Sequence, residues 1–410
     1  MKAVLVPALL TLAAAGAQAQ QVLPEQENWK VSADVVYTAA GEPIEKGLIT
    51  ISEGVIRSVT KGGGSNGKLS LHVAAITPGM VDLSARVGTG SGSVEQSREV
   101  APDLRVADTL DVFDVDWDIQ ARSGVTTVLV NPPDFDVIGG LGVVVKTAGP
   151  KGVAARRVKA DAVLRGAMGS QPSARNHPAF GRPEDFFSRR PTTRMGVEWE
   201  LRKAFYDAAA SAASEDRAFR GSDQLLAVLQ GQRPLMLQAW TTQDIRTAIF
   251  FKEEMETEGL GQVRLILDAA AEAWKEPEML ARSGAAVVLP PYPTDGRTRE
   301  NSFMALHCAK LVHDLGLQLA LSAHGSRDPG ARLDRQAGFA MRGGLPFKAA
   351  LKAVTINPAR MVGVDDRVGS IEVGKDADLV LWQGTPFEPT GRIIGVVLQG
   401  ELVLDPRAND

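Results

Sequence analysis

Residues 76–86 read ITPGMVDLSAR, and this stretch decides the fold. A short apolar run enters a Pro-Gly step and leaves through Asp82, which is typical of a buried strand that ends in polar residues. Side chains on a β-strand alternate between its two faces, so residues two positions apart point the same way. Ser84 and Arg86 are therefore expected to share one face at the end of this strand.

Apolar strands and helical patterns alternate beyond this stretch. Eight strands with interleaved helices predict an α/β fold, a (β/α)₈ TIM barrel. After the strand at 76–86, further strands are expected near residues 125–130, 141–146, 162–168, 234–238, 263–267, 286–289 and 318–321. Helices are expected near residues 108–123, 197–212, 243–258, 272–283, 302–315 and 346–354.

The two ends of the chain have a different pattern. Short β-branched runs separated by turn residues occupy residues 31–59, and strand and turn chemistry returns from residue 369 to 404. Both ends therefore predict one small composite β-sandwich beside the barrel. The expected boundaries are a signal peptide at 1–19, an N-terminal sandwich segment at 20–75, the barrel at 76–361 and a C-terminal sandwich segment at 362–410.

Composition excludes several classes of protein. The 410 residues are 44% hydrophobic with a net charge of -4, and Lys and Arg are scattered, so no nucleic-acid partner is expected. No segment is long enough for a membrane span.

The N-terminus has the three regions of a secretory signal. Lys2 precedes an apolar run at residues 3–15, and Ala17-Gln18-Ala19 forms a small-x-small cleavage site. We expect cleavage after Ala19 and export to the periplasm or the exterior. Cys308 is the single cysteine, so an internal disulfide is excluded.

Several blocks resemble the amidohydrolase superfamily, nearest to its imidazolonepropionase-like and dihydroorotase-like members. The first barrel strand of that superfamily is written Pro-Gly-x-x-Asp-x-His-x-His, and residues 78–86 match it except at both histidines. The block at 353–360 running into 369–380, with its Gly-Lys-Asp-Ala-Asp-Leu-Val end, is the most specific match. The resemblance covers nearly the whole mature chain.

The resemblance implies a metal site that activates water to attack an amide-like C–N bond, with ligands at the carboxyl ends of several barrel strands. When the ligand positions of the superfamily are carried over to this sequence, other residues stand at them. Trp240 lies just beyond Gln238, at the end of the fifth strand. Ser84 and Arg86 stand for two histidines, Ser170 for a bridging acid or lysine, Gln238 for a histidine, Asp268 near another histidine, and His324 for an acid.

The ligand count predicts that the metal site is lost. A metal needs about three or four protein ligands, and only Asp268 and His324 could bind one. The Arg86 guanidinium stays protonated and would repel the ion. We therefore expect no cofactor, and we expect the emptied barrel mouth to remain a binding pocket. One hypothesis pairs Asp268 with Arg86, and another makes His324 a general base in place of a structural role.

Three functions stay open at this point. The first is a pseudoenzyme, a non-catalytic subunit or regulator of a metal-bearing amidohydrolase paralogue. The second is an active hydrolase of non-peptide C–N bonds, amide or cyclic amide, that uses Asp268 and His324 with one zinc-type metal or none. The third is a periplasmic small-molecule binding protein. A homo-oligomer is compatible with each of them.

Overall fold

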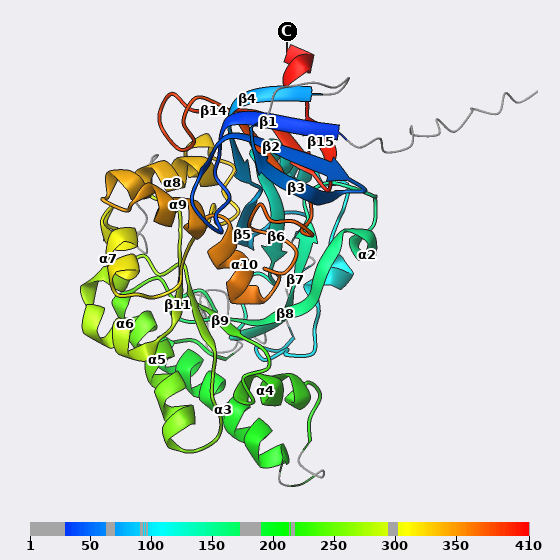
Figure 1. Cartoon of the computed structure of the whole chain (residues 1–410). Coiled ribbons are helices and arrows are strands. Elements are labelled where there is room, and N and C mark those ends of the chain that lie inside the picture. Colours follow the sequence, from blue (N-terminus) through cyan, green and yellow to red (C-terminus); the bar gives the residue numbers. More distant parts are fainter. Residues whose placement is uncertain are drawn as a thin grey trace, which may run out of the picture.

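The computed structural model describes residues 29–62, 70–90, 93, 95, 97–172, 190–212, 214, 218–293 and 302–409. The predicted signal segment at residues 1–19 lies outside these ranges. The chain forms a barrel wrapped by helices, with a separate sheet packed at one end of it (Figure 1). Within the described ranges, no helix combines the length and the apolar character needed to cross a bilayer.

The barrel is one eight-stranded sheet in the order β12-β11-β10-β9-β8-β7-β6-β5. This confirms the predicted (β/α)₈ architecture. Its strands are β5 (Met80–Ala85), β6 (Val125–Val130), β7 (Ile138–Lys146), β8 (Arg157–Ala167), β9 (Leu235–Gln238), β10 (Leu265–Asp268), β11 (Ala286–Leu289) and β12 (Leu319–Leu321).

The first and last strands are joined through a side chain. Asp82 on β5 accepts hydrogen bonds from Ser322 Oγ (2.6 Å) and from the backbone N–H of Ala323 (3.0 Å), both directly after β12. The Asp82 carboxylate is fully buried. The aspartate of the organising stretch therefore brings the two edge strands of the barrel together.

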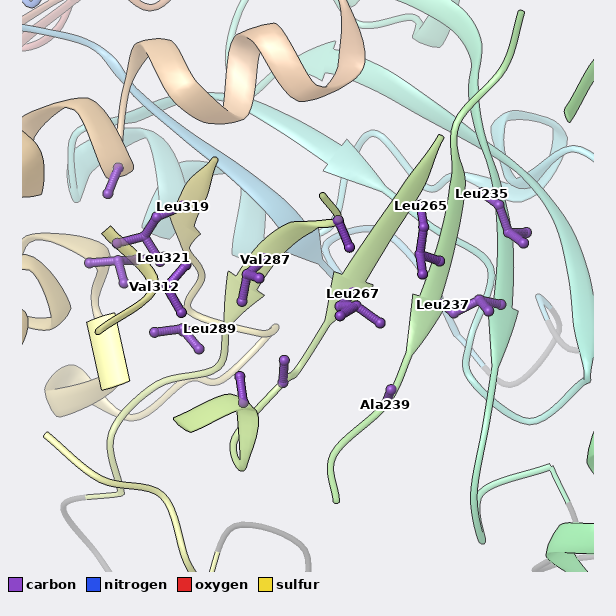
Figure 2. Packing of buried hydrophobic residues seen from close by; sticks show 14 of the residues in the cluster. Leu235, Leu237, Ala239, Leu265, Leu267, Val287, Leu289, Val312, Leu319 and Leu321 are labelled. Carbon is purple, nitrogen blue, oxygen red and sulfur yellow. The ribbon is translucent and has the colours of Figure 1, made fainter. Parts of the chain in front are cut away.

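Alternation along the strands separates the barrel interior from its outer surface. Leu235 and Leu237 on β9 belong to the outer cluster that packs under the helices, and Figure 2 shows them with their counterparts on the neighbouring strands. Met236, between them, belongs to the interior cluster, which also includes Ile266 on β10. By this period of two, Gln238 and Asp268 are placed inside the barrel at its carboxyl end.

One strand departs from a regular (β/α)₈ pattern. β7 pairs antiparallel with both β6 and β8, whereas the other barrel pairs are parallel. A short loop joins β6 to β7, and it leaves no room for a helical crossover, so the chain reverses direction. The strand begins at Ile138, earlier than the predicted 141.

The second sheet combines both ends of the chain, as predicted. Its order is β15-β14-β13-β4-β1-β2-β3, so C-terminal β13 pairs antiparallel with N-terminal β4. The strands are β1 (Trp29–Val36), β2 (Ile44–Ser52), β3 (Val55–Lys61), β4 (Ser70–Pro78), β13 (Leu379–Gln383), β14 (Arg392–Leu398) and β15 (Glu401–Leu404).

A buried ion pair joins this sheet to the barrel. Lys146 at the end of β7 lies 2.5 Å from Oδ2 of Asp378 and 2.9 Å from Oδ2 of Asp376. Its side chain is 1% exposed, so its ammonium charge is balanced inside the protein. Both aspartates belong to the Gly-Lys-Asp-Ala-Asp-Leu-Val block, which therefore has a structural role here.

The helices cover the outside of the barrel, and α10 closes its base through Val362 and its neighbours in the interior cluster. They are α1 (Asp116–Arg122), α2 (Val153–Arg156), α3 (Arg194–Ala212), α4 (Ser222–Leu229), α5 (Thr242–Thr257), α6 (Pro277–Ser283), α7 (Cys308–Asp314), α8 (Leu333–Arg342), α9 (Phe347–Ala353) and α10 (Ile356–Val362). Short 3₁₀ turns lie at Val106–Thr109, Ala273–Lys275, Pro329–Ala331 and Pro406–Asn409.

The helix predicted at 108–123 is shorter than expected. Asp111 and Asp114 each accept a hydrogen bond from a backbone N–H two residues ahead, at 2.8 and 2.9 Å. Such local turns compete with helical hydrogen bonds, so α1 begins only at Asp116.

Candidate functional site

A buried cluster of charged side chains fills the carboxyl end of the barrel around Arg165. This residue of β8 is 1% exposed. Its Nε and Nη2 donate to Oδ1 of Asp134 at 2.8 and 2.6 Å, and Nη2 also donates to Oδ2 of Asp268 at 2.6 Å. We call this three-residue unit the arginine bridge, because one guanidinium joins two carboxylates from different segments of the chain.

Three of the residues predicted from the sequence surround the arginine bridge. Ser84 Oγ donates to Oδ2 of Asp268 at 2.7 Å. Gln238 Nε2 and Arg86 Nη2 both donate to Oδ2 of Asp134, at 2.7 and 2.8 Å. The structure thus brings these residues into one hydrogen-bonded network in which each carboxylate has more than one donor.

The predicted pairing of Asp268 with Arg86 is wrong. Arg165 takes that place, and Arg86 donates to Asp134 instead. The Arg86 side chain is 48% exposed, which places it at the rim of the barrel mouth. Its path depends on Gly325, where a Cβ atom would stand 2.7 Å from the Arg86 side chain.

Ser170 occupies a different position from the network residues. It lies half-buried in the turn that follows β8. The adjacent Gly169 packs against the Asp244 carboxylate, and its φ of +83° is in the left-handed region that favours glycine. Ser170 therefore belongs to the wall beside α5.

His324 and Trp240 complete the mouth. His324 Nε2 lies 3.8 Å from Oδ2 of Asp268, and its ring meets the Trp240 ring edge-on with centroids 5.1 Å apart. His324 has a φ of +51°, and Ala269, which follows Asp268, has a φ of +54°. Left-handed backbone costs a non-glycine residue about 1–2 kcal/mol, and such strain concentrates at functional sites.

The surroundings set the charge state of the cluster. Burial would raise the pKa of Asp268, but the charge of Arg165 and the Ser84 hydroxyl outweigh it and hold that pKa below its usual range. Burial lowers the pKa of His324, and Asp268 opposes this only in part, so the imidazole is neutral near pH 7. Burial raises the pKa of Asp82. Asp268 and Arg165 therefore form the charged pair, with His324 as a neutral neighbour.

Sequence reasoning missed Arg165 and Asp134, the two residues that organise the cluster. Arg165 carries a usable signal, because it is the one charged residue in the apolar run at 162–168. Asp134 stands in a loop after Asn131-Pro132-Pro133, and nothing local marks it as a partner of β8.

Comparisons with known proteins assign the fold. A profile described as Amidohydrolase family matches residues 305–403. The crystal structure of an amidohydrolase from Thermotoga maritima MSB8 superposes with a TM-score of 0.79 and 26% identity, covering 92% of this chain and 99% of that one.

The chain belongs to the amidohydrolase superfamily. Amidohydrolase tasK from Hapsidospora irregularis is 25% identical over 369 residues, which cover 80% of this chain and 36% of that protein. This chain therefore spans about a third of the length of that relative. An adenosine deaminase from Xanthomonas campestris with bound zinc shares the fold at a TM-score of 0.51 and 17% identity.

Members of the superfamily typically use a divalent metal, so the donor set of this site is the relevant test. Among the residues that the structure describes, no group of three or more His, Cys, Asp and Glu side chains is arranged to hold an ion. The position between Asp134 and Asp268 is taken by the Arg165 guanidinium, which has donors and no acceptor. These residues do not fit a divalent cation.

Proposed function

We propose that this amidohydrolase-superfamily chain is a metal-independent pseudoenzyme that serves as a subunit or regulator of a metal-bearing relative. The observation that carries the proposal is the arginine bridge. Asp268, one of the two candidate ligands expected from the sequence, already accepts hydrogen bonds from Arg165 and Ser84. The site therefore resembles a cation site with a permanent cation supplied by the chain itself.

Electrostatics supports the loss of the metal. Two like unit charges about 4 Å apart repel by about 4 kcal/mol at an effective dielectric constant of 20, and a divalent ion doubles that. Burial would lower the pKa of Arg165, but Asp134 and Asp268 outweigh it and raise that pKa, so the guanidinium does not lose its proton to admit an ion. Arg86 adds a second positive charge beside Asp134.

An exposed apolar surface supports the role as a subunit. Met195 and Trp199 on α3 are 77% and 56% exposed, and Phe250 on α5 is 44% exposed. The ion pair between Arg202 and Glu254 holds these two helices side by side. Large exposed apolar and aromatic side chains on adjacent elements are typical of protein interfaces.

Metal analysis and co-purification test the proposal. Protein purified from its native host and dialysed is expected to carry far less than one zinc, manganese or nickel ion per chain. Affinity capture is expected to recover a relative whose first barrel strand retains His-x-His, and Trp199→Ser is expected to weaken that capture. Near-stoichiometric metal refutes the loss of the site, and capture that never recovers such a relative refutes the partner.

One observation favours a second candidate function. Burial lowers the pKa of His324, and its Nε2 lies 3.8 Å from Oδ2 of Asp268 with no hydrogen-bond partner among the described residues, so this nitrogen is available to act as a general base. Under this alternative the chain hydrolyses non-peptide C–N bonds. Turnover of an amide or cyclic amide that His324→Gln abolishes and that a chelator leaves intact would favour it.

Two points remain, the location of the protein and a third candidate function. The N-terminal signal pattern supports export to the periplasm or beyond. A small-molecule binding protein without an enzymatic partner is the third candidate, and ligand binding without any captured relative would favour it.

A further inference from the structure

A cavity lies on the flank of the barrel, apart from the arginine bridge. Its volume is about 730 Å³, within the range of about 300–1,000 Å³ that small-molecule sites occupy. One wall is α3, and the other is made by Arg98 and Val100 together with the turn before α4. No residue of the arginine bridge or of the network around it contributes to the lining that the structure describes.

One side of this cavity carries excess positive charge. Arg98 Nη2 donates to Oδ1 of Asp103 at 2.8 Å, and Arg220 Nε lies 2.5 Å from the other carboxylate oxygen. Two guanidiniums thus share the Asp103 carboxylate, and the two guanidiniums belong to the described lining whereas Asp103 does not. Each guanidinium has five N–H donors, so both retain donors for an incoming anion.

The opposite side carries excess negative charge. Glu200, Lys203 and Asp207 follow each other at spacings of three and four on α3, which places them on one face of the helix. Lys203 pairs with Asp207. Glu200 is half-buried, and within the described chain no ion pair engages it. This wall therefore carries one net negative charge.

Apolar side chains also line the cavity. Val100, Ala204 and Phe219 contribute to the lining, and Val100 is fixed by a parallel bridge to Ile138 at the start of β7. A ligand that fits must therefore present a negative group, a positive group and an apolar body together.

We propose that this cavity binds a zwitterionic amino acid or short peptide. The ligand carboxylate is held by Arg98 and Arg220, and the ligand ammonium by Glu200 with Asp207. Carboxylate–guanidinium hydrogen bonds are the stronger, charge-assisted kind, so the carboxylate end fixes the orientation. The site is independent of the proposed function, because it uses none of the residues in the arginine bridge.

Calorimetric titration of the full chain with the dipeptide alanyl-leucine tests the proposal. We expect saturable binding that weakens at least about tenfold when the probe is N-acetylated or C-amidated, since each cap removes one charged contact. Glu200→Gln keeps the shape of the helix face and is expected to lose affinity for the free dipeptide while binding the N-acetylated probe as the wild type does. Arg98→Gln is expected to weaken binding of the free dipeptide as C-amidation does.

The control variant is Arg282→Gln, which breaks an exposed pair with Glu253 away from the cavity. It is expected to leave binding unchanged. The proposal is overturned by absence of saturable binding, by equal affinity for free and capped probes, or by affinity that Glu200→Gln leaves unaltered. Selective loss on C-amidation alone would show an anion site and would also overturn it.

Discussion

Replacing Arg165 with methionine is the sharpest test of the arginine bridge. Methionine keeps most of the side-chain volume and removes the charge, so Asp134 retains Arg86 and Gln238 as donors. Among the described residues, Asp268 then keeps Ser84 as its one hydrogen-bond donor and stays fully buried. The expected damage is therefore concentrated on one uncompensated carboxylate.

The magnitude follows from the burial of the pair. Removing one partner of a buried ion pair costs about 3–5 kcal/mol, because a charge is left without compensation. Folded domains have only about 5–15 kcal/mol in total, so Arg165→Met is expected to remove a large share of the stability. Adding Asp268→Asn to Arg165→Met is expected to restore some of the loss, since the amide carries no charge.

Urea unfolding followed by tryptophan fluorescence and circular dichroism measures these free energies. The matched control is Arg327→Met, which removes an arginine that donates to Asp116 at 2.8 and 3.0 Å from a side chain that is 72% exposed. Such exposed pairs contribute little to stability, because solvent and salt screen them. If Arg165→Met costs no more than Arg327→Met, or if Asp268→Asn adds a further full loss, the reasoning about the bridge is refuted.

Three further predictions concern the rest of the molecule. Lys146→Met is expected to lower the free energy of unfolding in urea by about 3–5 kcal/mol, because it leaves the buried Asp378 carboxylate without its opposite charge. A loss no larger than that of Arg327→Met would contradict this prediction. Burial lowers the pKa of His324, so the unfolded chain binds more protons than the folded one, and the free energy of unfolding should fall as pH drops below about 6.5. His324→Gln should flatten this part of the plot of stability against pH, and an unchanged plot would contradict the prediction. Trp382→Phe removes the indole N–H that donates to the buried Thr77 hydroxyl at 2.9 Å, and it should lower the free energy of unfolding by about 1–3 kcal/mol. An unchanged melting temperature would contradict this prediction.

The fold was predictable from the sequence because its signals are local. Apolar strands that alternate with helical patterns predict a barrel, and the block around Asp378 predicts the returning C-terminal strands. A period of two reads the same for parallel and antiparallel strands, so the direction of β7 is indicated only by the short loop before it. The late start of the helix at Asp116 depends on turns made by single aspartates.

The site was predictable only to a degree. Ser84, Gln238, Asp268 and His324 come at strand ends, and the carboxyl ends of barrel strands meet in one place. Their hydrogen-bond partners depend on distances across the barrel, which no local pattern encodes. Arg165 was the decisive omission, since a charge inside an apolar run must find an opposite charge nearby.

The reversed strand β7 has a consequence for how the barrel keeps its alignment. Its nine residues rise about 3.3 Å each, so it spans nearly the full height of the wall. Asp134 is anchored shortly before its first residue, and Lys146 is anchored at its last. Sliding β7 by a single position would pull both anchors out of place and turn its side chains to the opposite face. The two ion pairs thus fix both ends of β7, so a shift of this strand at the barrel mouth is coupled to a shift at the base.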